Sequence, residues 1–338
     1  MTIRFPRLVL ALVGITTLLI GQVATATDPI IIKFSHVVAP DTPKGKAAEQ
    51  FAKLAAERTK GAVKVEVYPN SQLYKDKEEL EALQLGAIQM LAPSLAKFGP
   101  LGVREFEAFD LPYLFDNYDD LHKVTQGPVG KMLLAKLDAK GITGLTYWDN
   151  GFKQMSANKP LRTPDDVKGL KLRIQSSKVL DAQMRALGAL PQVMAFSEVY
   201  QALQTGVVDG TENPVSNLYT QKMHEVQKYL TLSNHGYLGY AVIVNKKFWD
   251  GLPPELRTAL EGAIKDATAF ANDIAKKEND DALEKVKAAK TTEVITLTAE
   301  QKKAWKKALI PVHKEVEERI GKELIDTIHK EVGFDATL

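Results

Sequence analysis

The chain has 338 residues with 45% hydrophobic and 25% charged side chains, which is an ordinary globular composition and enough length for two domains. Its formal net charge of +2 gives no support to nucleic-acid binding, which needs a concentrated basic face. The chain contains no cysteine, so disulfides, thiol catalysis and a lipid attached to a processed N-terminal cysteine are excluded.

The N-terminal segment, residues 1–26, has the pattern of a cleaved signal peptide. Arg4 and Arg7 precede an apolar run from Leu8 to Ile20, and small residues at 24–26 provide a peptidase site. The run has 13 residues, whereas a membrane-spanning helix needs about 20. Cleavage removes two of the 44 basic residues and no acidic one, which leaves 42 of each sign. We therefore predict a free, soluble protein in the bacterial periplasm.

The next stretch of the chain alternates predicted strands and helices. Strands are expected at 30–35 and 63–68, and helices from Pro43 to about Thr59 and from about 77 to Gly86, before an apolar stretch at 88–92. This order predicts an α/β domain with a largely parallel sheet. Ligands of such sheets bind beyond the carboxyl ends of the strands.

Two basic side chains lie near the end of the first predicted strand. His36 follows that strand directly, and Lys44 is expected in the first turn of the next helix, where a cation opposes the helix dipole. Both are candidates for ligand binding. A structural histidine and a solvated lysine are the alternatives.

The crossing into a second domain is predicted near residue 150. An apolar segment at 106–115 is broken by proline and leads into a helix that ends near Gly141. A strand at 144–148 then precedes Asp149-Asn150-Gly151, which is a turn pattern. We expect the chain to leave the first domain at this turn.

The second domain is organised around the stretch 169–177. Apolar residues at 170, 172 and 174 alternate with Lys171, Arg173 and Gln175, which predicts a strand with one face in the core. Arg173 is thereby held on a rigid element, where its planar guanidinium suits two oxygens of a carboxylate. A solvated surface arginine is the alternative.

The remaining elements continue the α/β order. Asn213 is expected at the end of a short strand, beside a proline that keeps its backbone extended. A helix from Pro253 to about Lys290 is longer than most globular helices and suggests a strut across both domains. The other predicted elements are helices at about 178–187 and after Ser197, strands at 207–210, 238–245 and 294–297, and two C-terminal helices.

No common catalytic signature is present in the sequence. A nucleophile elbow, a phosphate loop, a dinucleotide glycine pattern and a paired-histidine zinc motif are all missing, and the six histidines lack ligand spacing. We therefore expect no catalytic residue, no metal site and no cofactor. A secreted enzyme that processes organic acids through an unrecognised acid–base pair is the alternative from another class.

Five strings in the second domain resemble the solute-binding proteins of tripartite ATP-independent periplasmic (TRAP) transporters. They lie, in order, at 168–173, 194–200, 202–205, 208–210 and 212–214. The resemblance extends from about Ile30 to about Ile325. Two further stretches, 36–45 and 150–156, resemble the C4-dicarboxylate-binding members of that family.

The resemblance implies an α/β, two-lobe periplasmic binding protein of type II-like architecture, with mixed, mostly parallel sheets and a long helix spanning both lobes. We expect capture of a C4-dicarboxylate such as succinate, malate or fumarate between the lobes, delivery to the TRAP membrane permease, and a monomer. A 2-oxo acid, an aromatic acid or a sugar acid is the alternative ligand. The expected boundaries are 27–150 with about 237–275 for lobe I, 151–236 with about 290–310 for lobe II, about 254–290 for the bridging helix, and about 311–338 for the C-terminal helices.

The resemblance also implies roles for individual residues. Arg173 is expected to pair with a ligand carboxylate, Asn213 to form a hydrogen bond nearby, and Phe196 to line the pocket. Apart from the resemblance, each charge of a dicarboxylate needs a cation or a cluster of donors, and Lys44, Lys153 or His36 can hold the second carboxylate. Many sialic-acid-type members carry a second arginine at the position of Lys153, so a sialic acid ligand is not expected. The predicted lining is completed by Ser94, Trp148, Ser176 and Tyr237.

Overall fold

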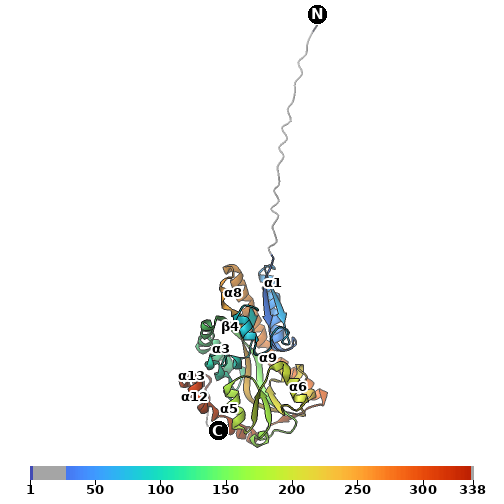
Figure 1. Cartoon of the computed structure of the whole chain (residues 1–338), viewed down its shortest axis with the longest axis vertical. Helices are drawn as coiled ribbons and strands as arrows, with labels where there is room; N and C mark the ends of the chain where they lie inside the picture. The colour runs from blue at the N-terminus through green and yellow to red at the C-terminus, as the bar shows by residue number, and fades with distance from the viewer. Residues whose placement is uncertain (3–27, 336–338) are drawn as a thin grey trace.

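The computed structural model describes residues 1–2 and 28–335 (Figure 1). Residues 3–26 of the predicted signal peptide lie outside the described residues. Across the described ranges, no helix has the length and apolar character needed to cross a membrane.

The strands of the described residues form one mixed, nine-stranded sheet in the order β2-β1-β3-β8-β4-β7-β5-β6, with β9 paired to β8. Five of its strand pairs are parallel, β1 with β2 and β3, β5 with β6 and β7, and β8 with β9. The strands are β1 Ile30–Ser35, β2 Val63–Tyr68, β3 Met90–Leu91, β4 Ile142–Ala157, β5 Lys171–Ile174, β6 Leu190–Val193, β7 Gly210–Asn213, β8 Tyr229–Asn245 and β9 Glu293–Thr296.

Two long antiparallel strands, β4 and β8, run through both halves of the molecule. Val244, near the end of β8, pairs with β3, whereas the last residues of β4 pair with β7. We call the half that contains β1–β3 lobe I and the half that contains β5–β7 lobe II. In Figure 1, lobe I with α1 and α8 lies at the top of the folded part, and lobe II with α5 and α6 lies below it.

The predicted turn at Asp149-Asn150-Gly151 is wrong, because these residues lie inside β4. The register between β4 and β8 shifts between Asp149 and Gly151. Such an irregularity bends a strand without ending it. The turn-forming residues therefore mark a bend at the place where the shared strands pass from one lobe to the other.

The helices cover the sheet and extend across both lobes. They are α1 Pro43–Arg58, α2 Glu79–Gln84, α3 Tyr118–Gln126, α4 Pro128–Lys136, α5 Lys178–Ala186, α6 Val199–Gln204, α7 Val215–Thr220, α8 Lys246–Asp250, α9 Pro254–Ala289, α10 Ala299–Leu309, α11 Val312–Glu315, α12 Glu317–Ile320 and α13 Lys322–Val332. Four helices rather than two follow β9 in the described residues. The first break lies next to Pro311, and the last lies at Gly321, whose φ of 106° a helix does not allow.

The predicted long helix is confirmed as α9, which has 36 residues. It packs against α1 in lobe I, against the shared strand β4 and against α7 in lobe II. Alanines along its buried face, among them Ala263, Ala267 and Ala271, permit this close approach. The core beside it contains Phe34 of β1, stacked on Trp148 of β4 at 5.8 Å between ring centroids.

Candidate functional site

A cleft between the lobes contains two neighbouring cavities. The inner cavity has a volume of about 20 Å³ and the outer cavity a volume of about 380 Å³. Asp76, Lys97 and Gln175 line both cavities, so the two cavities are adjacent. The inner cavity is also lined by Val37, Val38, Lys44, Ser94, Phe196, Asn213, Asn217, Leu238 and Tyr240, and the outer one by Lys77, Leu80, Glu81, Gln84, Pro100, Leu101, Arg173, Ser176, Val193, Met194 and Ala195.

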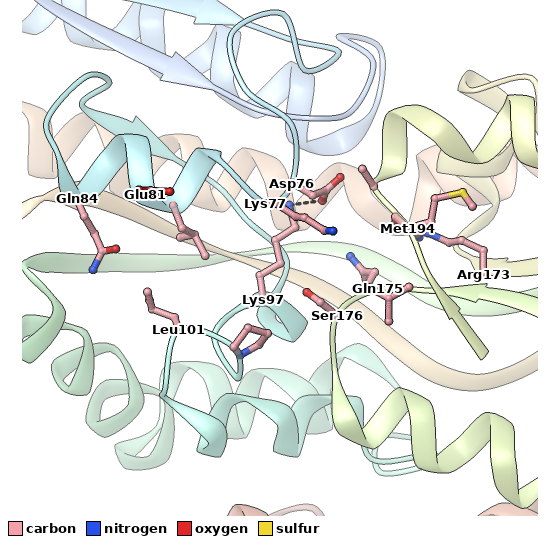
Figure 2. Close-up of a pocket in the computed structure, with 14 residues that line it drawn as sticks. Asp76, Lys77, Glu81, Gln84, Lys97, Leu101, Arg173, Gln175, Ser176 and Met194 are labelled. Atoms are coloured by element: carbon pink, nitrogen blue, oxygen red, sulfur yellow. Dashed lines mark hydrogen bonds and ion pairs between the residues drawn. The ribbon is translucent and has the colours of Figure 1, made fainter. Parts of the chain in front are cut away.

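Arg173 lies on β5 and borders the outer cavity with 2% of its surface exposed (Figure 2). Its Nε and Nη2 atoms donate to the carbonyl oxygen of Met194 at 3.0 and 2.8 Å, and its Cζ lies 5.7 Å from the ring centroid of Phe196. Burial lowers the pKa of Arg173, although the charges of Asp76 and Glu212 oppose that effect. Within the described residues it forms no ion pair with a carboxylate. A buried guanidinium without a carboxylate partner is suited to bind an anionic ligand.

Lys44 is the corresponding cation of lobe I. It lies in the first turn of α1, where Thr42 caps the helix, and 1% of its surface is exposed. Its Nζ atom donates to the carbonyl oxygen of Ala92 at 3.0 Å and lies 3.8 Å from the ring centroid of Tyr240. Burial, followed by the charge of Lys97, lowers the pKa of Lys44 to about 7. Lys44 likewise has no carboxylate partner in the part of the chain that the structure describes.

Lys97 is a third cation of the cleft, and it was not predicted. Its Nζ atom forms ion pairs with Asp76 and Glu79, and the first of these pairs is drawn in Figure 2. Asp76 also accepts a hydrogen bond from the backbone N–H of Phe196 in lobe II, at 2.6 Å. Burial alone would raise the pKa of Asp76, but Lys97 and Arg173 lower it to about 2. The charge of Lys97 is thus already balanced within the protein.

The remaining polar groups of the cleft come from both lobes. Gln175, the first residue after β5, donates to Ser94 Oγ at 2.7 Å and so connects lobe II with lobe I. Asn213, at the end of β7, donates to Thr211 Oγ1 at 3.4 Å and lines the inner cavity. The structure therefore brings the predicted residues Lys44, Ser94, Phe196 and Asn213 together around the inner cavity, and Arg173 and Ser176 around the outer one.

Four predicted site residues lie outside the lining of both cavities. Trp148 is fully buried in the core and donates to Thr268 Oγ1 at 3.0 Å, and Tyr237 donates to Asp149 Oδ1 at 2.7 Å. His36 is buried beside Val37, and burial, with a smaller effect of Lys44, lowers its pKa to about 3.

Lys153 is the fourth of these residues. Its Nζ atom pairs with Glu212 at 2.9 Å, and both side chains are 1% exposed. The Nε2 atom of His235 lies 3.6 Å from the same carboxylate. The ammonium of Lys153 therefore has a counter-ion inside the protein, unlike the cations Lys44 and Arg173.

Two signals in the sequence pointed toward the residues that were missed. In the sequence, Gln175 alternates with apolar residues in the same way as Arg173 does. Lys97 comes three residues after Ser94, shortly after the end of β3. The rule that ligands bind beyond the carboxyl ends of strands applies to both. Tyr240 gave no such signal, because an aromatic residue inside an apolar strand is most often a core residue.

The chain is similar to known solute-binding proteins over most of its length. The family model described as bacterial extracellular solute-binding protein, family 7, matches residues 34–319. The chain is 70% identical over 323 residues to the C4-dicarboxylate-binding periplasmic protein DctP of Rhodobacter capsulatus, covering 95% of this chain and 97% of that protein. It is 45% identical to the C4-dicarboxylate-binding protein DctB of Bacillus subtilis, covering 88% of this chain and 85% of that protein.

Solved structures of TRAP periplasmic solute-binding proteins share the fold. The protein from Sulfurospirillum deleyianum with bound succinate has a TM-score of 0.87 and 49% identity, covering 89% of this chain and 99% of that one. The protein from Pseudomonas aeruginosa with bound L-malate has a TM-score of 0.83 and 46% identity, covering 85% of this chain and all (100%) of that one. The predicted two-lobe architecture is confirmed by these neighbours.

Proposed function

We propose that this chain, which belongs to family 7 of the bacterial extracellular solute-binding proteins, is the periplasmic substrate-binding subunit of a TRAP transporter for C4-dicarboxylates. It captures succinate, malate or fumarate in the cleft between its lobes and delivers the ligand to the membrane permease. The names of its relatives and the ligands of its structural neighbours support this choice of substrate. The observation that carries the proposal is the pair of buried cations, Arg173 and Lys44, that lack carboxylate partners among the described residues.

The two cations match the two carboxylates of the ligand. Arg173 belongs to lobe II and Lys44 to lobe I, so a dicarboxylate that contacts both must lie across the cleft. Asn213 adds an amide donor beside the inner cavity. A buried cation without a counter-ion costs several kcal/mol, and a carboxylate placed against it offsets that cost. The bound ligand therefore favours the closed arrangement of the lobes.

The role is that of a receptor, without covalent chemistry. The family is one of binding proteins. The groups that line the cleft provide charges and hydrogen-bond donors and acceptors. We further propose that the chain acts as a monomer and that its closed form is what the permease recognises.

Calorimetric titration with succinate and with butyrate tests the proposal. Both ligands have four carbons, but butyrate has only one carboxylate. We expect saturable binding of succinate at one site and at least about 100-fold weaker binding of butyrate, because a second charge-assisted contact is lost. Equal affinities, or no binding of succinate, malate or fumarate, would exclude the proposed substrate class. Recovery of chemically altered succinate after incubation would favour an enzyme instead.

A further inference from the structure

The side chain of Asn150 occupies the bend of β4 between the lobes. It is fully buried at 0% exposure, and the register of β4 with β8 shifts at this residue, between Asp149 and Gly151. Its backbone carbonyl oxygen accepts a hydrogen bond from Asn279 Nδ2 of α9 at 2.8 Å. The position of Asn150 is therefore fixed by the shared strand and by the helix that spans both lobes.

The amide of Asn150 forms hydrogen bonds in two directions. Its Nδ2 atom donates to Tyr240 Oη at 2.6 Å, on the part of β8 beside β3, and to Asn217 Oδ1 at 2.9 Å, on α7. Its Oδ1 atom accepts from Ser216 Oγ of α7 at 2.9 Å. The amide thus has one partner in lobe I and two in the segment that follows β7 in lobe II, and both of its N–H groups are used.

The partners of Asn150 are part of the wall of the cleft. Tyr240 and Asn217 both line the inner cavity. The Nζ atom of Lys44 lies 3.8 Å from the centroid of the Tyr240 ring. The hydrogen bond from Asn150 to the Tyr240 hydroxyl therefore also fixes the position of the ring that contacts Lys44.

We propose that Asn150 is a positioning residue that couples lobe closure to assembly of the Lys44 side of the ligand site, an inference that rests on the proposed function. Its two N–H groups are satisfied together only when α7 and β8 have their closed arrangement. Opening the lobes breaks at least one of these bonds and releases Tyr240. The amide stabilises the ligand-bound, closed state and has no role in the first encounter of ligand with the open cleft.

Stopped-flow measurement of intrinsic tryptophan fluorescence during succinate binding separates the two rate constants. We expect Asn150→Ala to raise the dissociation rate constant by roughly tenfold and to leave the association rate constant unchanged, because only the closed state loses hydrogen bonds. Tyr240→Phe retains the ring under Lys44 and removes only the hydroxyl, so it should raise the dissociation rate in the same direction with little risk to folding. The effects of the two changes in the double variant should be less than multiplicative, because both changes remove the bond between Asn150 and Tyr240.

Asn158→Ala is the matched control. Asn158 follows the end of the same strand, is exposed, and accepts a hydrogen bond from the backbone N–H of Lys228 at 3.1 Å, outside this network. It should keep the wild-type rates. Wild-type dissociation rates in both Asn150→Ala and Tyr240→Phe would overturn the coupling while leaving the proposed function intact. A wild-type protein that does not bind succinate would overturn the proposed function, and the coupling with it.

Discussion

Arg173 and Lys44 differ from the other buried cations of the cleft region in the partners they have. Lys97 pairs with two carboxylates and Lys153 with one. Among the described residues, the charged groups of Arg173 and Lys44 instead donate to backbone carbonyl oxygens and lie near aromatic rings. Burial of a charge is costly unless it is paired. These two residues are therefore where an anionic ligand contributes the most stabilisation.

Replacing Arg173 by lysine tests the need for a forked donor. Lysine keeps the charge but cannot bind two carboxylate oxygens in the planar geometry of a guanidinium. We expect Arg173→Lys to weaken succinate binding by about 1.5–3 kcal/mol, measured by calorimetry. Arg185→Lys, at an exposed arginine of α5 that pairs with Asp181, is the control and should leave affinity unchanged. An unaltered affinity in Arg173→Lys would remove Arg173 from the site.

The lowered pKa of Lys44 predicts a pH dependence of binding. Its pKa of about 7 in the unliganded protein is raised when a carboxylate binds beside it. Above about pH 7, binding must therefore take up a proton, and succinate affinity should fall as pH rises, by at most about tenfold per pH unit. Calorimetry in buffers of different ionisation enthalpy measures that proton uptake directly.

Variants of α1 assign this proton to Lys44. In Lys44→Met the dependence between about pH 7 and about pH 9 should be reduced, whereas Lys53→Met, at an exposed position of the same helix, should retain it. Wild-type affinity that stays constant over this range would contradict the lowered pKa of Lys44, and an unchanged affinity in Lys44→Met would contradict its role in carboxylate binding.

The sequence identifies some site residues and not others for physical reasons. Arg173 could be predicted because strand alternation places it on a defined face, and Lys44 because a cation opposes the dipole at a helix start. Whether a buried lysine faces a ligand or a protein carboxylate depends on contacts between distant segments. The pairing of Lys153 with Glu212, 59 positions apart, is not encoded by any local pattern.

At the level of elements, β4, β8 and α9 form the connection between the lobes. Asn272 and Asn279 of α9 bind the backbone of Asp149 and Asn150 at 3.0 and 2.8 Å. Both predicted strands in this region, 144–148 and 238–245, were shorter than the observed ones. Asparagine and glycine weaken a strand pattern in the sequence, but pairing with the neighbouring strand and contact with α9 maintain the extended backbone.

Gly151→Ala tests how closely α9 packs on this bend. A Cβ atom at Gly151 would lie 2.7 Å from Asn279 Nδ2, so the Asn279 side chain, which binds the backbone of Asn150 and Ser216, or the backbone around it must shift. We expect a loss of about 1–3 kcal/mol in the free energy of unfolding, measured by urea denaturation. Gly236→Ala is the control on the paired strand, because a Cβ there would meet Lys153 Cδ at an ordinary 3.5 Å. Equal stability of both variants would show that the contact tolerates a methyl group.

At the scale of the whole molecule, the lobes contact each other through apolar side chains, such as Val38 against the cluster of Phe196 and Val199, and through polar bonds. Asp76 accepts from the N–H of Phe196, Gln175 donates to Ser94, and Lys75 forms an exposed pair with Glu198 at 3.0 Å. Exposed ion pairs contribute at most about 1 kcal/mol. A dicarboxylate that contacts Arg173 and Lys44 would add charge-assisted bonds to these contacts and so favour the closed arrangement.

Small-angle scattering tests this dependence. We expect the radius of gyration to decrease when succinate is added to the wild-type protein and to change much less when butyrate is added, because butyrate cannot contact the cations of both lobes at once. An identical radius with and without saturating succinate would contradict closure driven by the ligand.

The central claim is that one dicarboxylate lies between Arg173 of lobe II and Lys44 of lobe I. A crystal structure of the protein with succinate measures this directly. The prediction is that one carboxylate accepts hydrogen bonds from the Arg173 guanidinium and the other lies within hydrogen-bonding distance of Lys44 Nζ. Succinate bound elsewhere, or bound while Lys44 still contacts only Ala92 and Tyr240, would contradict it.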